Sequence, residues 1–289
     1  MPIHNLKKRV PMPIKRLVYQ YRDFLAWVQL EFETITAKIN PTPIIILGNQ
    51  KAGTSAIASL LGHMTGKSFH VDLMKANERN IYVDLKKGTV SFDDFINLNR
   101  LEFSKEIVKE PNLSLFYDEL TQYFASAKFI LVVRDPRDNI RSILDRYKIS
   151  GNIQQMKPEH YQSLVRSWPS VFDGQWLGIE GENHIEMLAG RWNYIADVFL
   201  LNSNSILLVK YEQFLQNKIQ EISRIAESLG MEKINDISDQ VNIQYQPAGK
   251  NKNVKYEEFF CQENLDKIER ICGARMKKLG YKLNGEIKP

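Results

Sequence analysis

The sequence predicts an α/β fold in which a parallel β-sheet is covered on both faces by helices, giving a three-layer sandwich. Two observations predict it. Short runs of apolar residues recur along the chain, and each is followed by a stretch with apolar residues at helical spacing. Strands that alternate with helices in this way form parallel sheets through right-handed crossovers.

The first predicted strand is the continuous apolar run 44–47, which is typical of a strand buried on both faces. Asn-Pro-Thr-Pro at 40–43 breaks the chain before it and ends a preceding helix. After a glycine-rich turn, apolar residues recur at i, i+3, i+4 and i+7 and predict a helix. These residues are Ile57, Leu60, Leu61 and Met64.

Two further buried strands are predicted at 129–133 and 206–209. The helix after the former buries Ile140, Ile143, Leu144 and Tyr147, and the helix after the latter buries Leu215, Ile219, Ile222, Ile225 and Leu229. A last helix runs from about Gln262 to Leu279. We divide the chain into a basic segment and amphipathic helix at 1–42 and one domain at 43–289.

Composition excludes several classes of protein. The chain has 289 residues, of which 43% are hydrophobic and 25% charged, as in ordinary globular proteins. The net charge of +5 suits anionic ligands, but no basic run with interleaved aromatics indicates nucleic acid. On one helix Cys261 and Cys272 would lie about 16 Å apart, too far for a disulfide. We therefore expect a cytoplasmic protein with free thiols; its oligomeric state cannot be read from the sequence.

Residues 1–22 contain six basic residues and no acidic one. Apolar residues follow at helical spacing from Leu17 to Ile39. One interpretation is a helix that lies on an anionic membrane surface, which would make the protein peripheral. The other is a helix packed across the main domain, which the acidic Glu31 and Glu33 favour because they would repel anionic lipid.

The segment from about 150 to 190 differs from the rest, with glycine, proline, scattered aromatics and weak periodicity. We interpret it as a helical, loop-rich excursion from the sheet that recognises the acceptor of a transfer reaction. His160 and His184 lie in or beside it and are candidate substrate contacts. The alternative is a packing subdomain.

The turn Gly48-Asn-Gln-Lys-Ala-Gly-Thr-Ser55 has the frame of a phosphate-binding P-loop. Backbone N–H groups at the start of the following helix and its dipole make an anion site. Thr54 stands where an ATPase would have its lysine, and Lys51 lies inside the loop instead. There Lys51 would neutralise charge on a leaving phosphate.

A second motif opens off the strand 129–133. Arg134 leaves the carboxyl end of that strand, where ligands bind in open α/β sheets. Ser142 falls on the side of the next helix opposite its apolar face. An arginine with a hydroxyl partner makes a phosphate clamp. The alternative is an ion pair between Arg134 and Asp135 at the start of the helix.

Together the two motifs resemble the sulfotransferase family that uses 3′-phosphoadenosine 5′-phosphosulfate (PAPS) and releases 3′,5′-ADP (PAP). The resemblance spans about residues 43–282 and implies no metal. It implies that the loop grips the 5′-phosphosulfate and that Arg134 and Ser142 bind the 3′-phosphate. The loop residues are Lys51, Ala52, Gly53, Thr54 and Ser55.

The resemblance extends to three weaker features. Tyr211 opens a Tyr-Glu-Gln-Phe segment whose tyrosine lies by the adenine in some members. Gly249-Lys250-Asn251 and the closing stretch 276–281 look like bacterial and carbohydrate sulfotransferases. One departure is Ala56, since an aromatic that stacks on adenine often stands there. Lys250 is therefore a further donor-binding candidate, and the adenine contacts are open.

The family's base lies before the second strand and is a histidine or a glutamate. The sequence here reads Val108-Lys-Glu-Pro-Asn112, so we assign Glu110 as the base, with Lys109 beside the transferred group. A partly desolvated carboxylate can act as a base near neutral pH. The alternative is a surface Lys-Glu pair. Other candidates for the base are His63, His70 and Asp84.

The sequence thus predicts a sulfotransferase that moves sulfuryl from PAPS to a hydroxyl or amine, with a carbohydrate or glycolipid as the favoured acceptor. A P-loop small-molecule kinase, with Asp135 or Asp138 holding magnesium, is one alternative. A non-catalytic nucleotide-binding module, which keeps the pocket but has lost the base, is another.

Overall fold

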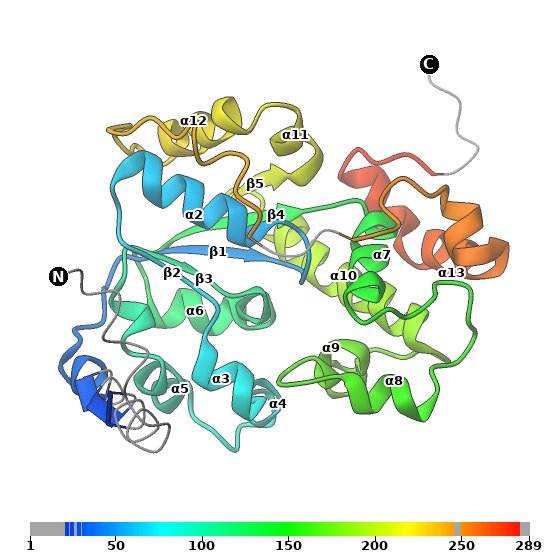
Figure 1. Ribbon diagram of the computed structural model, residues 1–289, viewed down its shortest axis with the longest axis horizontal. Coiled ribbons are helices and arrows are strands. Elements are labelled where there is room, and N and C mark those ends of the chain that lie inside the picture. The colour runs from blue at the N-terminus through cyan, green and yellow to red at the C-terminus, as the bar shows by residue number, and fades with distance from the viewer. Residues whose placement is uncertain (1–20, 23, 26–27, 30, 246–248, 284–289) are drawn as a thin grey trace, which may run out of the picture.

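A five-stranded parallel sheet forms the centre of the computed structural model (Figure 1). The structure describes residues 21–22, 24–25, 28–29, 31–245 and 249–283. The strands follow the order β2-β3-β1-β4-β5. They are β1 (Ile44–Gly48), β2 (Phe69–Val71), β3 (Ile107–Lys109), β4 (Lys128–Val133) and β5 (Ile206–Lys210). The loops that leave β1, β3 and β4 therefore meet side by side at one edge of the sheet.

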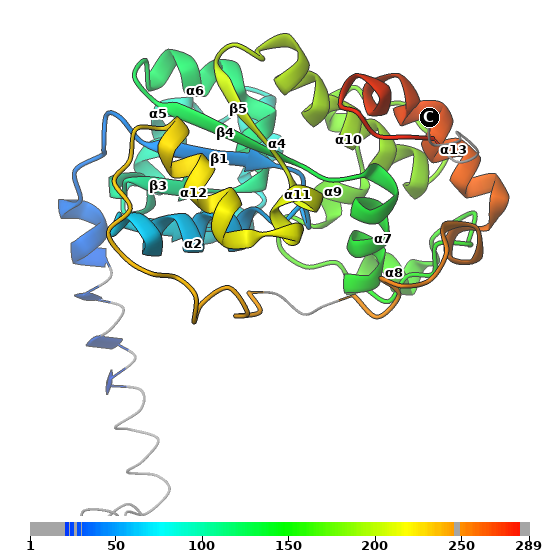
Figure 2. The same ribbon diagram turned by 90° about the horizontal axis from the view of Figure 1, so that it is seen from above.

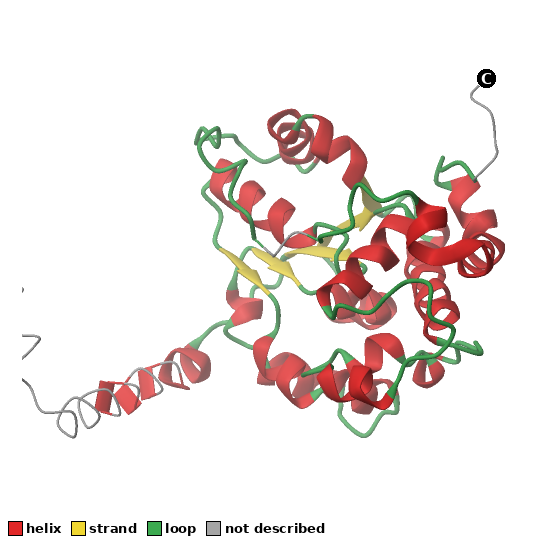
Figure 3. Ribbon diagram, turned by 45° about the vertical axis from the view of Figure 1, so that its right-hand side comes forward, coloured by secondary structure: helices red, strands yellow, loops and turns green. Residues whose placement is uncertain are grey.

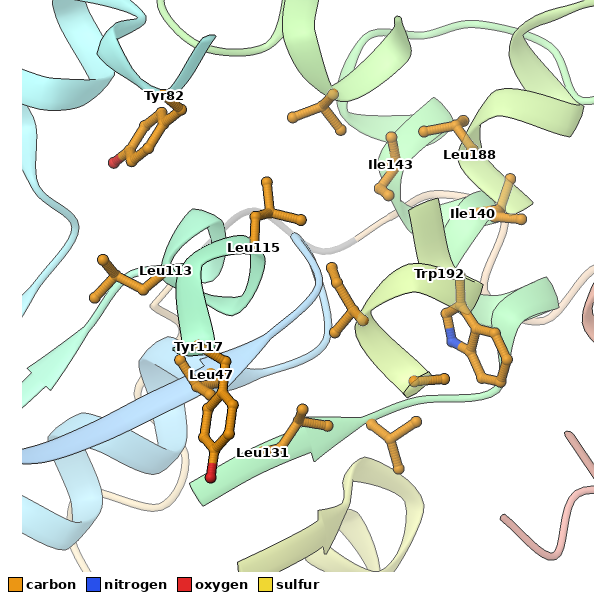
Figure 4. Packing of buried hydrophobic residues seen from close by; sticks show 14 of the residues in the cluster. Leu47, Tyr82, Leu113, Leu115, Tyr117, Leu131, Ile140, Ile143, Leu188 and Trp192 are labelled. Atoms are coloured by element: carbon orange, nitrogen blue, oxygen red, sulfur yellow. The ribbon is translucent and has the colours of Figure 1, made fainter. Parts of the chain in front are cut away.

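Alternate residues of β1 enter two separate cores. Ile44 and Ile46 pack with α2 (Thr54–Thr65) and α12 (Lys218–Ser228) on one face of the sheet. Ile45 and Leu47 pack on the other face, where Figure 4 shows Leu47 and Leu131 below residues of α7 and α10. The helices of this second face include α6 (Tyr117–Tyr123), α7 (Pro136–Arg146), α10 (His184–Leu201) and α13 (Tyr256–Lys278). The predicted three-layer sandwich is confirmed (Figure 2).

The remaining helices are short and connect or flank these layers. They are α3 (Met74–Arg79), α4 (Ile81–Lys86), α5 (Phe92–Leu98), α8 (Pro158–Ser163), α9 (Pro169–Phe172), α11 (Tyr211–Gln216) and the 3-10 helices η2 (Glu102–Ser104), η3 (Pro111–Phe116) and η4 (Gln175–Leu177). Of these, α3 follows β2, η3 follows β3 and α11 follows β5, at the edge of the sheet where the strands end.

The three strands predicted from apolar runs are present, and two shorter ones were missed. β2 and β3 have three residues each and include the polar His70 and Lys109, so neither gives an apolar run. Both are specified by pairing instead, since Ile107 lies beside Ile44 on one side and Phe69 on the other. Register with neighbouring strands is information that a local pattern does not carry.

Three helices differ from the sequence prediction. The single helix expected after β5 is interrupted at Asn217, whose side chain caps α12 by accepting from the Gln220 N–H at 3.1 Å. Leu215 and Ile219, expected to be buried, are exposed. The 18-residue helix α10 was not predicted. The last helix has a break at Cys261 (φ 56°), so Cys261 and Cys272 do not lie on one continuous helix, and both are free thiols.

The described residues before β1 include helical turns at 21–22, 24–25, 28–29 and 31–36. Their apolar side chains are exposed, so the predicted packing of this helix across the domain is wrong for this stretch. The residues are Tyr21, Phe24, Leu25, Val28, Phe32 and Ile35. Leu17, the other apolar residue that opens the predicted helix, lies outside the described residues. In the described part of the chain, no helix is both long and apolar enough to cross a bilayer.

Candidate active site

The P-loop follows β1 as predicted and makes the turn into α2. Gly53 has φ 96°, and a Cβ there would lie 2.3 Å from the Tyr211 ring, so only glycine fits. Thr54 is the first residue of α2. The first N–H groups of a helix have no partner within it, and they point toward the space in front of the loop. The geometry is that of an anion site.

Buried polar side chains hold the loop from behind. The Ser114 hydroxyl accepts from the Gly48 N–H at 2.8 Å and donates to the Gly48 carbonyl at 3.1 Å. The Asn139 amide of α7 donates to the Gln50 carbonyl and accepts from the Asn49 side chain, both at 2.8 Å. These bonds join the end of β1 and the P-loop itself to η3 and α7, so the loop is fixed before any ligand arrives.

A fully buried arginine completes this network. Arg191 of α10 has no exposed surface and donates to Asn112 at 2.8 Å and to Gln50 at 3.2 Å. Burial lowers the pKa of Arg191 to about 10, against the opposing effect of Glu110. A guanidinium therefore sits under the P-loop and donates to the neutral amides of Asn112 and Gln50, and its charge adds to the positive potential of the site.

Arg134 and Tyr211 flank the loop on its β4 and β5 side. The Arg134 guanidinium donates to the Lys51 carbonyl at 3.0 Å and lies 4.7 Å from the centre of the Tyr211 ring. Ser142 lines the same cavity. Among the described residues Arg134 forms no ion pair with Asp135, which pairs with Arg137 at 2.6 Å instead.

Glu212, next to Tyr211, has a structural role. Its carboxylate accepts from the Asp135 N–H at 2.8 Å and from the Tyr281 hydroxyl at 2.9 Å. It thereby joins the turn after β5, the turn after β4 and the end of the chain. The two weaker motifs seen in the sequence, around Tyr211 and up to Tyr281, are thus parts of one contact.

A cavity of about 850 Å³ opens in front of the loop. Its lining includes most of the predicted donor residues: Lys51, Gly53, Thr54, Ser55, Lys109, Arg134, Ser142 and Tyr211, together with Glu110. Ala52, the other predicted loop residue, is buried behind them. Burial and then the charges of Arg146, Arg134 and Lys109 lower the pKa of Lys51 to about 8. Mutual repulsion of this kind is what an anionic ligand relieves.

Two carboxylates lie at the cavity near Lys109. Glu110 is 1% exposed and accepts three hydrogen bonds, from the Asn112 N–H at 3.0 Å, the Leu73 N–H at 3.1 Å and the Asn77 amide at 2.7 Å. Burial, and next the charge of Asp72, raises the pKa of Glu110. The surface Lys-Glu pair considered above is therefore wrong, since both residues are buried.

Asp72 is the carboxylate that the sequence reasoning missed. It follows β2 with φ 67°, its side chain is 40% exposed, and its Oδ1 lies 2.5 Å from the Lys109 Nζ. Lys109 itself is only 2% exposed. β2 was not predicted, so nothing in the sequence placed Asp72 at the edge of the sheet. An aspartate with a left-handed backbone beside a buried lysine is a feature often found at functional sites.

Besides Ala52, six predicted residues lie outside the lining of this cavity. His63 and Asp84 are exposed, and His70 lies on the edge strand β2. His160 accepts from the Lys157 N–H at 3.1 Å. His184 is 3% exposed, and burial lowers its pKa to about 4, so it is a neutral core residue. Lys250 is exposed, whereas its neighbours Gly249 and Lys252 line the cavity.

The segment before α13 closes one side of the cavity. Asp145 of α7 accepts from the Asn251 side chain at 2.5 Å, and Arg141 donates to the Val254 carbonyl at 2.5 Å. Ile243 and Tyr245 from this segment line the cavity on the α2 and α11 side. They were not predicted, and they supply apolar and aromatic surface that Ala56 does not.

The excursion at 150–190 reaches the opposite side. Its Val165, Arg166, Ser167 and Trp168 line the cavity. The Ser167 hydroxyl donates to the Asn77 side chain at 2.6 Å, which links the excursion to the residue that holds Glu110. Arg146 lies 5.0 Å from the centre of the Trp168 ring. The excursion thus contributes to the cavity, although much of α9 and α10 packs in the core.

The sulfotransferase domain family matches residues 41–269, which is most of the chain. The chain belongs to this family. It is a PAPS-dependent transferase, and its P-loop, Arg134 and Ser142 lie around one cavity as the resemblance implied. The family decides against the kinase alternative. Asp135 and Asp138, the magnesium ligands of that alternative, each pair with an arginine, Arg137 and Arg141 respectively.

Solved structures of sulfotransferases are similar in fold. Sulfotransferase STF9 from Mycobacterium avium is 11% identical, with a TM-score of 0.52 over 90% of this chain and 82% of its own. Sulfotransferase STF1 from Mycobacterium tuberculosis H37Rv is 14% identical, with a TM-score of 0.42 over 84% and 80%. No curated protein matches the sequence. The first similarity supports the α/β fold.

Proposed function

We propose that the enzyme transfers sulfuryl from PAPS to a hydroxyl, or an amine, of a carbohydrate or glycolipid acceptor. The proposal that PAPS is the donor rests on the arrangement of Lys51, Arg134 and Ser142 around one cavity. They lie on elements that are far apart in sequence. PAPS brings the sulfuryl group and two separate anionic ends. The chain supplies cations and helix N–H groups on the same wall to bind both.

The donor residues divide the work by position. The backbone of Gly53 and Thr54 and the Lys51 ammonium would hold the 5′ end, where negative charge grows as the leaving group departs. Arg134 and Ser142 would hold the 3′-phosphate. The apolar surface for the adenine ring of the donor comes from Ile243, Tyr245 and Tyr211. The positive charge of the cavity residues matches the negative charge of the donor. Only glycine fits at position 53, and the lack of a side chain there keeps the loop backbone accessible.

For the acceptor's proton, the two carboxylates beside Lys109 are the candidates. The Glu110 carboxylate already accepts three hydrogen bonds, which leaves it little capacity to accept another from the hydroxyl of a substrate. Asp72 is far more exposed and contacts the Lys109 ammonium. We therefore propose Asp72 as the base. Glu110, the assignment made from the sequence, becomes a positioning residue that fixes the turns carrying Asp72 and Lys109.

The acceptor is proposed to enter on the side of Asp72 and the excursion. That side carries the exposed apolar Met74 and Val165, and the basic Arg146 and Arg166. This combination of apolar and cationic protein surface suits an acceptor that has both a hydroxylated head and an apolar part. This favours a glycolipid over a free sugar.

Thermal melting tests the donor assignment. At about 100 times its dissociation constant a ligand stabilises a protein by roughly 2.7 kcal/mol. We expect a clear shift with 3′,5′-ADP, little shift with ADP and magnesium, and a weaker shift with 3′,5′-ADP in Lys51→Ala and Arg134→Ala. A larger shift with magnesium-ADP would overturn the donor site. A screen of sugars and glycolipids with radiolabelled PAPS then tests the acceptor class.

A further inference from the structure

Arg146 is the last residue of α7, and its exposed side chain lines the cavity. The other two arginines of this helix, Arg137 and Arg141, each pair with a carboxylate. Arg146 pairs with no carboxylate of the described residues, and its guanidinium lies 5.0 Å from the centre of the Trp168 ring. A guanidinium over an aromatic ring keeps its N–H donors for another group. Arg146 is therefore a cation in the cavity whose charge no described acidic side chain balances.

The position of Arg146 along α7 places it on the acceptor side of the cavity. The helix starts next to Arg134 and rises about 1.5 Å per residue, so Arg146 lies about 15 Å from its first residue. Trp168, over which the guanidinium lies, belongs to the excursion and packs edge-on against Tyr147, with ring centres 5.1 Å apart. Figure 1 and Figure 3 both show α8 and α9 of the excursion below α7. Arg134 and Arg146 thus lie at opposite ends of one helix, the former on the donor side and the latter beside the excursion.

The carboxylates of the cavity are engaged by other groups. Its lining contains four of them among the described residues, and each has a partner: Asp72 contacts Lys109, Asp138 pairs with Arg141, Asp145 accepts from Asn251, and Glu110 accepts three hydrogen bonds. Burial, and then the charge of Arg146 ahead of the other neighbouring charges, lowers the pKa of Lys51 to about 8. Anions relieve such repulsion. The 5′ end of the donor is proposed to meet Lys51, which leaves Arg146 for a second anion.

Arg166 adds a second cation from the loop between α8 and α9. It lines the cavity, and its backbone is left-handed (φ 58°), a conformation that is strained for a residue other than glycine and that recurs at ligand sites. Its contact with Glu78 is long, at 3.9 Å, and both side chains are more than half exposed. An exposed pair of this kind contributes little to stability, so Arg166 can exchange Glu78 for a ligand.

We propose that Arg146, together with Arg166, binds an anionic group on the acceptor, so that the acceptor is an acidic sugar or glycolipid. The planar fork of a guanidinium matches two oxygens of a carboxylate or of a phosphate. This role of Arg146 rests on the proposed function, because it specifies the acceptor of the same transfer. With its anion held at the end of α7, the acceptor keeps a hydroxyl for Asp72 and the donor.

Calorimetric binding of three matched probes tests the anion site. Octyl glucoside, octyl glucuronide and octyl glucoside 6-phosphate differ only at C6, which is a hydroxymethyl, a carboxylate or a phosphate ester. We expect at least one acidic probe to bind about tenfold more tightly than the glucoside, or better, because a charge-assisted hydrogen bond is gained. The acidic probe that binds better identifies the anion. Raising the salt to about 0.5 M should reduce the difference. Equal binding of all three probes, or no binding, would overturn the proposal.

Two variants assign the preference to Arg146. Arg146→Gln should remove most of the preference for the acidic probe and leave the affinity for 3′,5′-ADP unchanged. Arg270→Gln is the matched control and should keep the preference, since the Arg270 side chain is 67% exposed and lies outside the cavity lining. Two results would show that Arg146 does not select the acceptor. One is a preference that survives in Arg146→Gln, and the other is a loss of 3′,5′-ADP affinity as large as in Arg134→Ala.

The anion site and the donor site fail separately, because the probes are measured with and without 3′,5′-ADP. A protein that binds 3′,5′-ADP but binds all three probes alike keeps its donor site and contradicts only the acidic acceptor. A protein that shows no thermal shift with 3′,5′-ADP and still prefers an acidic probe keeps the anion site and contradicts the proposed donor site.

Discussion

The two sides of the cavity are built differently. On the donor side, the P-loop is tied by buried side chains from η3, α7 and α10: Ser114, Asn112, Asn139 and Arg191. On the acceptor side, short helices and an excursion present the exposed Met74, Val165 and Arg166. The difference indicates that the chain fixes the proposed donor side in advance and builds the proposed acceptor side from surface residues, which can change at little cost to the fold.

The largest expected effect concerns Asp72. Its side chain takes part neither in the buried hydrogen bonds that hold the P-loop nor in those that hold Glu110. Asp72→Asn should keep the fold and the affinity for 3′,5′-ADP, while kcat falls by roughly 10²- to 10⁴-fold, the usual contribution of a general base. Activity assays with a responsive acceptor check this. Full activity of Asp72→Asn, together with loss of turnover in Glu110→Gln, would return the role of base to Glu110.

Glu110→Gln should instead act on stability. In this variant the NH₂ group of the glutamine would face three hydrogen-bond donors. At least one hydrogen bond would therefore be lost at a site that is 1% exposed. We expect a loss of about 1–3 kcal/mol in the free energy of unfolding. Urea denaturation measures it. The pH dependence of kcat separates the two roles, since a positioning residue should leave that profile in place.

Removal of Lys51 tests the donor side itself. Lys51→Met should lower kcat by about 10²- to 10³-fold, the range seen when a group that stabilises transition-state charge is removed. The free protein should not lose stability, because removing Lys51 relieves its repulsion with Arg146 and Arg134. A destabilised but fully active Lys51→Met variant would contradict this. Unfolding and turnover are to be measured on the same preparation.

The pH dependence of ligand binding follows from the lowered pKa of Lys51. In the free site Lys51 is charged below about pH 8 and neutral above it. An anionic ligand binds the charged form better, so affinity for 3′,5′-ADP should hold from pH 7 to 8 and then fall by up to about tenfold per pH unit. Titration calorimetry measures this. Lys51→Arg, which stays charged, should remove the fall.

The smallest effects should come from the acceptor side. Val165→Ala changes a residue that is 54% exposed, and the free energy of unfolding should stay within about 0.5 kcal/mol of the native value. Ser114→Ala is the contrasting change on the donor side, where Gly48 would lose both bonds to a buried hydroxyl, at a cost of about 1–3 kcal/mol. Equal stability of both variants would remove the contrast between the two sides.

Much of the proposed donor site could be predicted from local sequence patterns. A buried strand, a glycine-rich turn and an amphipathic helix are adjacent in sequence, so the P-loop and Lys51 were readable at once. Arg134 was readable because it ends an apolar strand. His184 was misplaced because it begins α10, an 18-residue helix that was not predicted, and burial then excluded it from the cavity.

The sequence by itself determined the fold class, the family and the residues proposed to bind the donor, because these depend on short-range periodicity and on spacing within single motifs. Only the tertiary structure decided which carboxylate meets Lys109 and which side chains hold the loop. Asp72 and Lys109 come together through the parallel pairing of β2 with β3. That pairing joins residues far apart in the chain, and no local pattern records it.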